Sequence, residues 1–106
     1  MRLIMVTLWY PLNKATEVAR KFLEVNEKIP QKPFEKSWLA GVRADEDGLK
    51  TIWLTEIEDG KLEEALDMTN RRLVEYMNIE GYRFKIETLM TFEYAMPLIG
   101  LEMPPA

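Results

Sequence analysis

LIMVTLWYP, residues 3–11, is the stretch that decides the fold of this 106-residue chain. Alternate side chains of a β-strand point to opposite faces, which here gives the two sets Leu3, Met5, Thr7, Trp9 and Ile4, Val6, Leu8, Tyr10. Both sets are almost entirely apolar, whereas a half-solvated strand alternates apolar and polar residues. We therefore predict that both faces of this strand are covered, one by the helices of the chain and the other by a second copy of the protein.

The composition is that of an ordinary globular domain, with 47% apolar and 30% charged residues. The chain is long enough for one domain with a modest core. No apolar run approaches the roughly 20 residues that a membrane span needs. The first strand follows Met1 and Arg2 directly, which leaves no room for a signal peptide, so we predict a cytoplasmic protein.

Two residue types are missing, because the chain contains neither cysteine nor histidine. Without cysteine there are no disulfides, thiol nucleophiles or thiolate metal ligands. Without histidine the chain lacks the commonest general base near neutral pH and the usual ligand of haem, zinc and non-haem iron. We therefore predict neither a metal ion nor a cofactor.

The remaining elements follow from periodicity. Apolar residues at helical spacing predict helices over about residues 14–28 and 61–80. Strand-forming runs predict strands over about residues 36–44, 50–57 and 82–94, the first two joined by a hairpin in which Gly48 takes a positive φ. The order is β-α-β-β-α-β, a ferredoxin-like unit of the α+β class with a four-stranded antiparallel sheet. We assign residues 1–96 to this domain and residues 97–106 to a proline-punctuated C-terminal tail.

Right-handed crossovers place both helices on one face of the sheet. We predict that the purely apolar sets lie beneath them: Ile4, Val6, Leu8, Trp38, Ala40, Val42, Ile52, Leu54, Phe84, Ile86 and Met90. The other sets form an open face: Met5, Thr7, Trp9, Leu39, Gly41, Arg43, Thr51, Trp53, Thr55, Glu87, Leu89, Thr91 and Glu93. This open face is too apolar for water and too polar for a plain core, which suits a lining shared between two subunits, with or without a ligand.

The element order, the length, the apolar open face and the long final strand resemble the dimeric α/β-barrel superfamily over essentially the whole chain. The resemblance implies a homodimer joined through the open sheet faces. The activities that it implies are varied, because the superfamily includes small monooxygenases, isomerases, lyases, haem enzymes and ligand-binding modules. Some of these monooxygenases oxidise phenolic or quinol substrates without metal or flavin, and Trp9, Tyr10 and Trp53 are compatible with that chemistry. The missing histidine argues against haem degradation.

Seven residues of the predicted open face are candidates for binding a ligand: Thr7, Trp9, Arg43, Trp53, Thr55, Glu87 and Thr91. Arg43 can bind a carboxylate or enolate oxygen, and the tryptophans can stack on a planar ring. Glu87 can act as a general base if burial raises its pKa. The alternative for each of these residues is a purely structural role.

The chain is therefore predicted to bind a small planar or aromatic organic molecule between the sheets of a homodimer. A cofactor-independent monooxygenase or isomerase is one alternative, and a structural homodimer without a ligand is another. RNA-recognition domains share the element order and stack bases on an open sheet. However, this chain carries a net charge of −4, has an acidic hairpin and lacks the basic–glycine–aromatic signature. We therefore predict neither a nucleic-acid nor a membrane partner.

Overall fold

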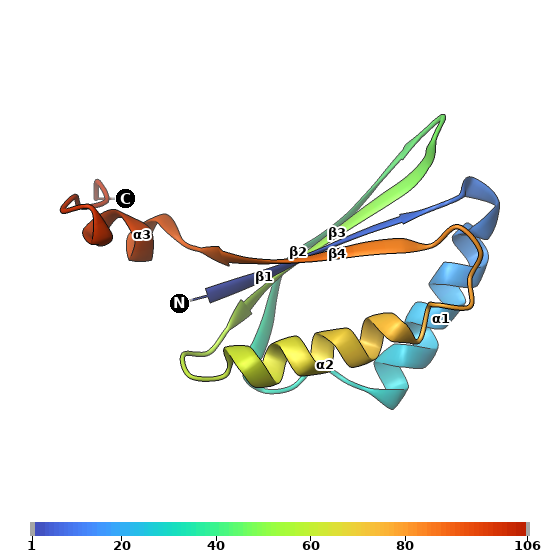
Figure 1. Cartoon of the computed structure of the whole chain (residues 1–106), viewed down its shortest axis with the longest axis horizontal. Coiled ribbons are helices and arrows are strands. Elements are labelled where there is room, and N and C mark those ends of the chain that lie inside the picture. The colour runs from blue at the N-terminus through green and yellow to red at the C-terminus, as the bar shows by residue number, and fades with distance from the viewer. Residues whose placement is uncertain (1, 106) are drawn as a thin grey trace.

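The computed structural model describes residues 2–105 and has one four-stranded antiparallel sheet with α1 and α2 on one side of it (Figure 1). Met1 and Ala106, the outermost residues of the predicted domain and tail, lie outside the described residues. The elements are β1 (Arg2–Tyr10), the 3₁₀ turn η1 (Leu12–Lys14), α1 (Ala15–Lys28), β2 (Glu35–Asp45), β3 (Gly48–Ile57), α2 (Leu62–Val74), β4 (Arg83–Met90) and α3 (Phe92–Leu98). The sheet order is β2-β3-β1-β4, so the predicted fold class and ferredoxin-like element order are confirmed.

Strand β1 lies inside the sheet, paired with β3 on one side and with β4 on the other. Its side chains Ile4, Val6 and Leu8 are buried toward the helices. They form one core cluster with Ile57 of β3 and with residues of α2. Burying a side chain of this size stabilises the fold by roughly 1.5–3 kcal/mol. Strand β1 is therefore paired along both edges, and the helices cover the face that carries Ile4, Val6 and Leu8.

A second core cluster joins α1 to the connection that follows α2. It consists of Val18 and Val25 from α1 together with Tyr76 and Ile79. Helix α2 ends at Val74 rather than near residue 80, so both of these C-terminal members lie beyond the helix. Gly81 ends the connection at a φ of +81°, a conformation that favours glycine.

The hairpin between β2 and β3 agrees with the sequence. Gly48 has a φ of +126°, as predicted. A Cβ atom there would lie 2.7 Å from the backbone oxygen of Tyr10, so the close approach of the hairpin to β1 also requires glycine.

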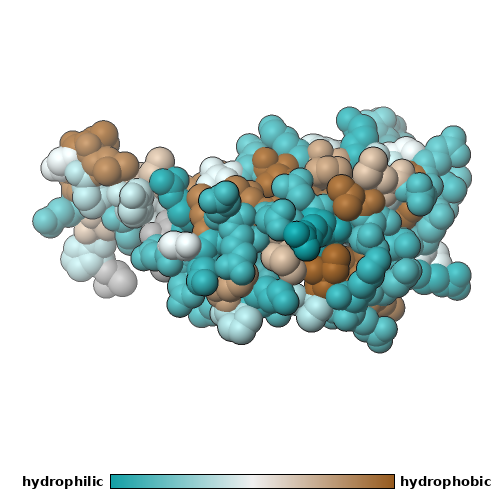
Figure 2. Space-filling view, turned by 60° about the horizontal axis from the view of Figure 1, so that its bottom comes forward, coloured by the Kyte–Doolittle hydropathy of each residue, from teal (hydrophilic) through white to brown (hydrophobic). Residues whose placement is uncertain are grey.

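The last strand is shorter than predicted. Strand β4 ends at Met90, and Thr91 begins the short helix α3 by accepting a hydrogen bond from the backbone N–H of Tyr94 at 3.3 Å. We call residues 91–105 the C-terminal arm. The arm extends away from α1 and α2 (Figure 1), and apolar residues gather on it at the left of Figure 2. Its exposed apolar side chains include Phe92, Leu98, Ile99 and Leu101. Within residues 2–105, no helix is both long and apolar enough to span a membrane.

Candidate functional site

Strand β3 presents to the helices the opposite set of side chains from the one predicted. Val6, which faces the core, lies opposite Trp53, and Ile4 lies opposite Thr55. Trp53 packs against Phe22 of α1 with their ring centroids 5.4 Å apart. The prediction that Trp53 and Thr55 lie on the open face was therefore wrong, and neither residue can line a space between two sheets.

The same correction applies to the neighbours of these residues on β3. Thr51 faces the helices and shares a 2.9 Å hydrogen bond with the Tyr10 hydroxyl, whereas Ile52 and Leu54 lie opposite the open-face residues Thr7 and Met5. The charged residues of β3 indicate which face of the strand is exposed, and the prediction from the sequence did not use them. Lys50 and Glu56 both alternate with Ile52 and Leu54, whereas the set from residue 49 to residue 57 that includes Trp53 is free of charge.

An irregularity in β2 moves Trp38 as well. The register with β3 shifts between Ser37 and Leu39, which leaves Trp38 as the extra residue of a bulge. Trp38 was predicted to lie beneath the helices. Instead, its indole Nε1–H donates a 2.7 Å hydrogen bond to Oε1 of Glu56, a residue of the open face.

Trp53 and Thr55 line a cavity of about 220 Å³ between the sheet and the helices. Its apolar wall includes Phe22 from α1 and Tyr76 from the connection after α2. Hydroxyl groups of the lining come from three elements: Ser37 on β2, Thr55 on β3 and Thr69 on α2. An apolar cavity with a few polar groups is the usual form of a small-molecule site. We call it the helix–sheet cavity.

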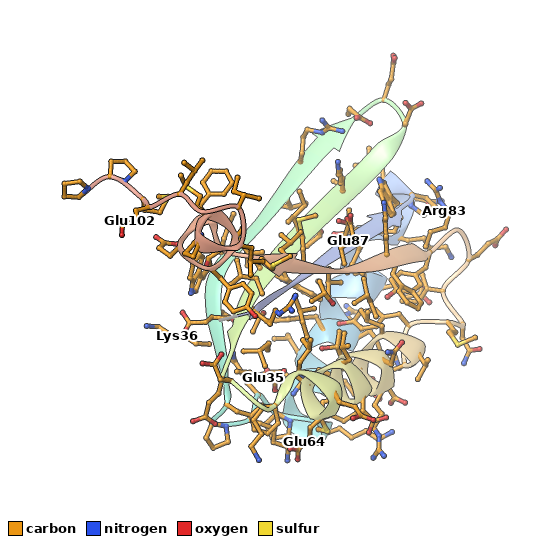
Figure 3. The ribbon with its side chains drawn as sticks, turned by 60° about the vertical axis from the view of Figure 1, so that its left-hand side comes forward. Glu35, Lys36, Glu64, Arg83, Glu87 and Glu102 are labelled. Carbon is orange, nitrogen blue, oxygen red and sulfur yellow. The ribbon has the colours of Figure 1, made fainter. Side chains whose placement is uncertain are left out.

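An ion pair closes the polar end of the helix–sheet cavity. Glu35 begins β2 and lies between the sheet and α2 (Figure 3), with 3% of its side chain exposed. Arg72 of α2 donates to both of its carboxylate oxygens, each at 2.7 Å, and also to the backbone oxygens of Ile29 and Pro30 at 3.0 Å. The backbone N–H of Lys32 donates to the same carboxylate at 2.9 Å. These contacts fix the segment between α1 and β2, and therefore the shape of the cavity.

Tyr76 lines the cavity and is packed against a second tyrosine. Tyr76 is 1% exposed and stacks on Tyr82 with ring centroids 5.2 Å apart. Burial raises the pKa of Tyr76 from 10.0 to about 12, with a smaller contribution from Tyr10. Burial also raises the pKa of Tyr82. Both hydroxyls therefore stay protonated near neutral pH.

The helix–sheet cavity offers a ligand few reactive groups. The charged residues of its lining are Glu35 and Arg72, and these are bound to each other. Its remaining polar groups are neutral hydroxyls and amides. The lining can therefore orient a molecule and exclude water, while acid–base catalysis would require breaking the ion pair. Among residues 2–105, no three acidic residues are grouped in a way that could hold a metal ion.

The open face carries the other candidates in rows across the strands. One row, nearest the β2–β3 hairpin, contains Arg43, Lys50, Trp9 and Arg83, and we call it the cationic row. Thr7 lies in the next row and Glu87 in the one after that, with Glu87 3.7 Å from Lys85. Arg83 and Glu87 lie on the side of β4 away from the helices (Figure 3). The open face therefore brings Trp9 and Arg43 into one row, with Lys50 between them.

Thr91 lies apart from both groups. It follows the end of β4 and caps α3, so its hydroxyl has a structural partner. The seven predicted residues thus occupy three places: the helix–sheet cavity, the open face and the start of α3. Phe22, Ser37, Thr69 and Tyr76 were not among the candidates, because only the tertiary packing brings them to the same cavity as Trp53.

Comparisons with known structures agree with the fold. The de novo designed protein Foldit4 aligns over 85% of this chain and 97% of its own, with a TM-score of 0.59 and 10% identity. A protein named "putative antibiotic biosynthesis monooxygenase" from Deinococcus radiodurans aligns over 86% of this chain and 92% of its own, with a TM-score of 0.58 and 13% identity. One of the same name from Caulobacter crescentus CB15 aligns over 83% and 87%, with a TM-score of 0.57 and 17% identity.

Neither a scan of protein families nor a search of curated proteins finds a match to this sequence. At such low identity, the structural likeness defines the class of fold. The chain is a ferredoxin-like α+β protein, which is the fold class predicted from its sequence.

Proposed function

We propose that this protein binds a small planar, mainly apolar organic molecule in the helix–sheet cavity. The observation that supports the proposal is the lining itself, in which Phe22, Trp53 and Tyr76 supply aromatic surface and hydroxyl groups lie on three different elements. Aromatic side chains pack on flat ligands, and a few hydroxyls give them a defined orientation. This moves the ligand from the space between two sheets to the inside of one subunit.

The size of the cavity narrows the class of ligand. Sites for drug-sized molecules have volumes of roughly 300–1,000 Å³. The helix–sheet cavity, at about 220 Å³, is smaller, so we expect a ligand of one or two rings. Because Glu35 and Arg72 neutralise each other, the cavity favours a neutral ligand over a charged one.

Cofactor-independent oxygenation is the second candidate function. Two structural neighbours bear the name of antibiotic biosynthesis monooxygenases, and the cavity combines aromatic and hydroxyl side chains. The lining lacks an uncommitted acid or base, so the reactivity in such a reaction would have to come from an easily oxidised ligand. Binding without catalysis requires less of these residues, and we therefore place it first.

The test is calorimetric titration with 1-naphthol, a neutral two-ring phenol. We expect saturable binding that Trp53→Ala weakens by about tenfold or more, since stacking on an aromatic ring contributes about 1 kcal/mol beyond the buried area. Trp38→Ala is the matched control, because Trp38 lies at the bulge and outside the cavity lining. Equal losses in both variants, or no binding to the wild-type protein, would refute the proposal. Oxygen consumption during the titration would favour the monooxygenase.

We also propose that the protein is a homodimer joined through the open sheet face. The part of that face away from the cationic row is rich in apolar residues, including Met5, Leu39, Ile52 and Leu54. A standard interface buries about 800 Å² on each partner, which is roughly a tenth of the 7472 Å² surface of this chain. The exposed apolar residues of the C-terminal arm follow β4 directly and supply further surface for the same contact.

Sedimentation analysis tests the homodimer. Leu39→Glu places a charge on the open face, whereas Leu23→Glu places one on α1, and both leucines are largely exposed in the single chain. We expect the wild-type protein and Leu23→Glu to sediment as dimers and Leu39→Glu to dissociate. A wild-type monomer at micromolar concentration would overturn the proposal.

A further inference from the structure

The cationic row crosses all four strands at the end of the sheet nearest the β2–β3 hairpin. The strand register places Arg43 opposite Lys50, Lys50 opposite Trp9, and Trp9 opposite Arg83. Side chains directly opposite on neighbouring strands have Cβ atoms about 4.5–5.5 Å apart. Three cations and one indole ring therefore lie side by side on a single face.

Two of the three cations have no acidic partner. The guanidinium of Arg83 lies over the Trp9 ring, 5.3 Å from its centroid. Within residues 2–105, neither Arg83 nor Lys50 forms an ion pair or a side-chain hydrogen bond. Arg43 differs, because its Nη2 lies 3.3 Å from Oδ2 of Asp45.

The nearby carboxylates do not neutralise these two cations. Asp45 is already occupied, since one of its oxygens contacts Arg43 and the other accepts the backbone N–H of Asp47 at 2.8 Å. The hairpin also carries Glu46 and Asp47, both exposed, and of these two Asp47 lines the hollow beside the cationic row. Among the residues that line the hollow beside the cationic row, the three cations Arg43, Lys50 and Arg83 outnumber the two carboxylates Asp45 and Asp47, although acidic residues outnumber basic ones in the whole chain, 18 to 14. A locally positive region in an acidic chain attracts anions.

The same residues surround a hollow. A cavity of about 330 Å³ is lined by Trp9, Arg43, Lys50 and Arg83, together with Asp45 and Asp47 of the hairpin and residues at the end of β1. A guanidinium stacked on an aromatic face keeps its N–H edge free, and that edge matches the two oxygens of a carboxylate. Charged side chains are depleted from the cores of protein interfaces, so the cationic row suits the rim of the proposed dimer, where a ligand can reach it.

We propose that the cationic row is a binding site for the carboxylate of a planar organic acid. Arg83 holds the carboxylate through two hydrogen bonds, Lys50 supplies the second positive charge, and Trp9 contacts the ring of the acid. This site is separate from the helix–sheet cavity and does not depend on the function proposed for that cavity.

The chain contains three tryptophans, which provide a reporter for each region. Trp9 belongs to the cationic row, Trp53 to the helix–sheet cavity and Trp38 to the bulge of β2. Their indole N–H signals can be followed by nitrogen-15 NMR and assigned with the three Trp→Phe variants. The titrant is benzoate at constant ionic strength, and benzyl alcohol is the uncharged matched control. We expect benzoate to shift the Trp9 signal saturably and benzyl alcohol to leave it in place.

Substitutions distinguish specific binding of benzoate at the cationic row from a general attraction to positive charge on this face. Lys50→Gln and Arg83→Gln should each weaken benzoate binding by about tenfold, because a charge-assisted hydrogen bond is lost in each. Lys85→Gln changes the same net charge on the same face one row away, and it should alter the affinity by less than about twofold.

Three results would overturn the proposal: no saturable shift of Trp9, an equal shift with benzyl alcohol, or an equal loss in Lys85→Gln. The response of Trp53 to 1-naphthol is recorded in the same spectra. A failure of one site is therefore distinguishable from a failure of the other.

Discussion

Arg72→Ala is predicted to destabilise the fold far more than the same change at the adjacent Arg71. Arg72 is bound to both oxygens of Glu35 and to two backbone carbonyls, and 20% of its side chain is exposed. Arg71 pairs with Asp67 at 3.1 Å, and both of those side chains are more than half exposed. The two variants share the same change in helix propensity, so the difference between them measures the buried contacts.

The expected magnitude follows from burial. Removing one partner of a buried ion pair costs about 3–5 kcal/mol, because the other charge remains buried without compensation. Here the Lys32 N–H still donates to Glu35, so we expect a loss near the lower limit, about 3 kcal/mol. An exposed pair contributes about 0.2–1 kcal/mol, which sets the expectation for Arg71→Ala.

Urea denaturation followed by circular dichroism measures both losses. With a slope of about 1–3 kcal/mol per molar urea, the midpoint of Arg72→Ala should fall by roughly 1–3 M. Replacing both Glu35 and Arg72 by methionine should recover at least half of the lost free energy of unfolding, because no buried charge is then left unpaired. A loss below about 1 kcal/mol in Arg72→Ala would refute the view that this pair fixes the segment between α1 and β2.

Three further predictions concern the core, one turn and the response to alkali. Leu8→Ala should lower the free energy of unfolding by about 2–5 kcal/mol, because Leu8 is 1% exposed. Leu23 is largely exposed, so Leu23→Ala should lower it by less than about 0.5 kcal/mol. Thermal unfolding of the two variants measures the difference. Gly81→Ala should destabilise the fold by more than about 1 kcal/mol, because Gly81 has a φ of +81° and a Cβ atom there would lie 2.6 Å from the ring of a proline. Gly41→Ala is the control: the added Cβ atom would meet open space, so this variant should have nearly wild-type stability. The pKa of Tyr76 is raised from 10.0 to about 12 in the folded state. The stability that the protonated Tyr76 side chain contributes is therefore complete below pH 10 and is lost as the pH rises from 10 to 12. Across that range, the free energy of unfolding should fall less steeply in Tyr76→Phe than in the wild-type protein.

The structure brings the predicted site residues together only in part. The prediction from the sequence placed tryptophans, hydroxyl residues and an arginine on one surface. Trp53 and Thr55 lie on the opposite face of the sheet from Trp9 and Arg43. The error came from sorting each strand by its apolar residues alone, whereas in β3 the charged residues Lys50 and Glu56 mark the open face.

The sequence by itself determined the order of the elements, the apolar character of both faces of β1 and the hairpin at Gly48. Each of these depends on local periodicity, on a strand that is apolar on both faces, or on one backbone conformation. The tertiary structure alone decided which way Trp38 points and which segments gather around Trp53. A shift of one residue in register moves every side chain of a strand to its other face, and both the bulge in β2 and the pairing of β3 with β1 are set by contacts between segments distant in sequence.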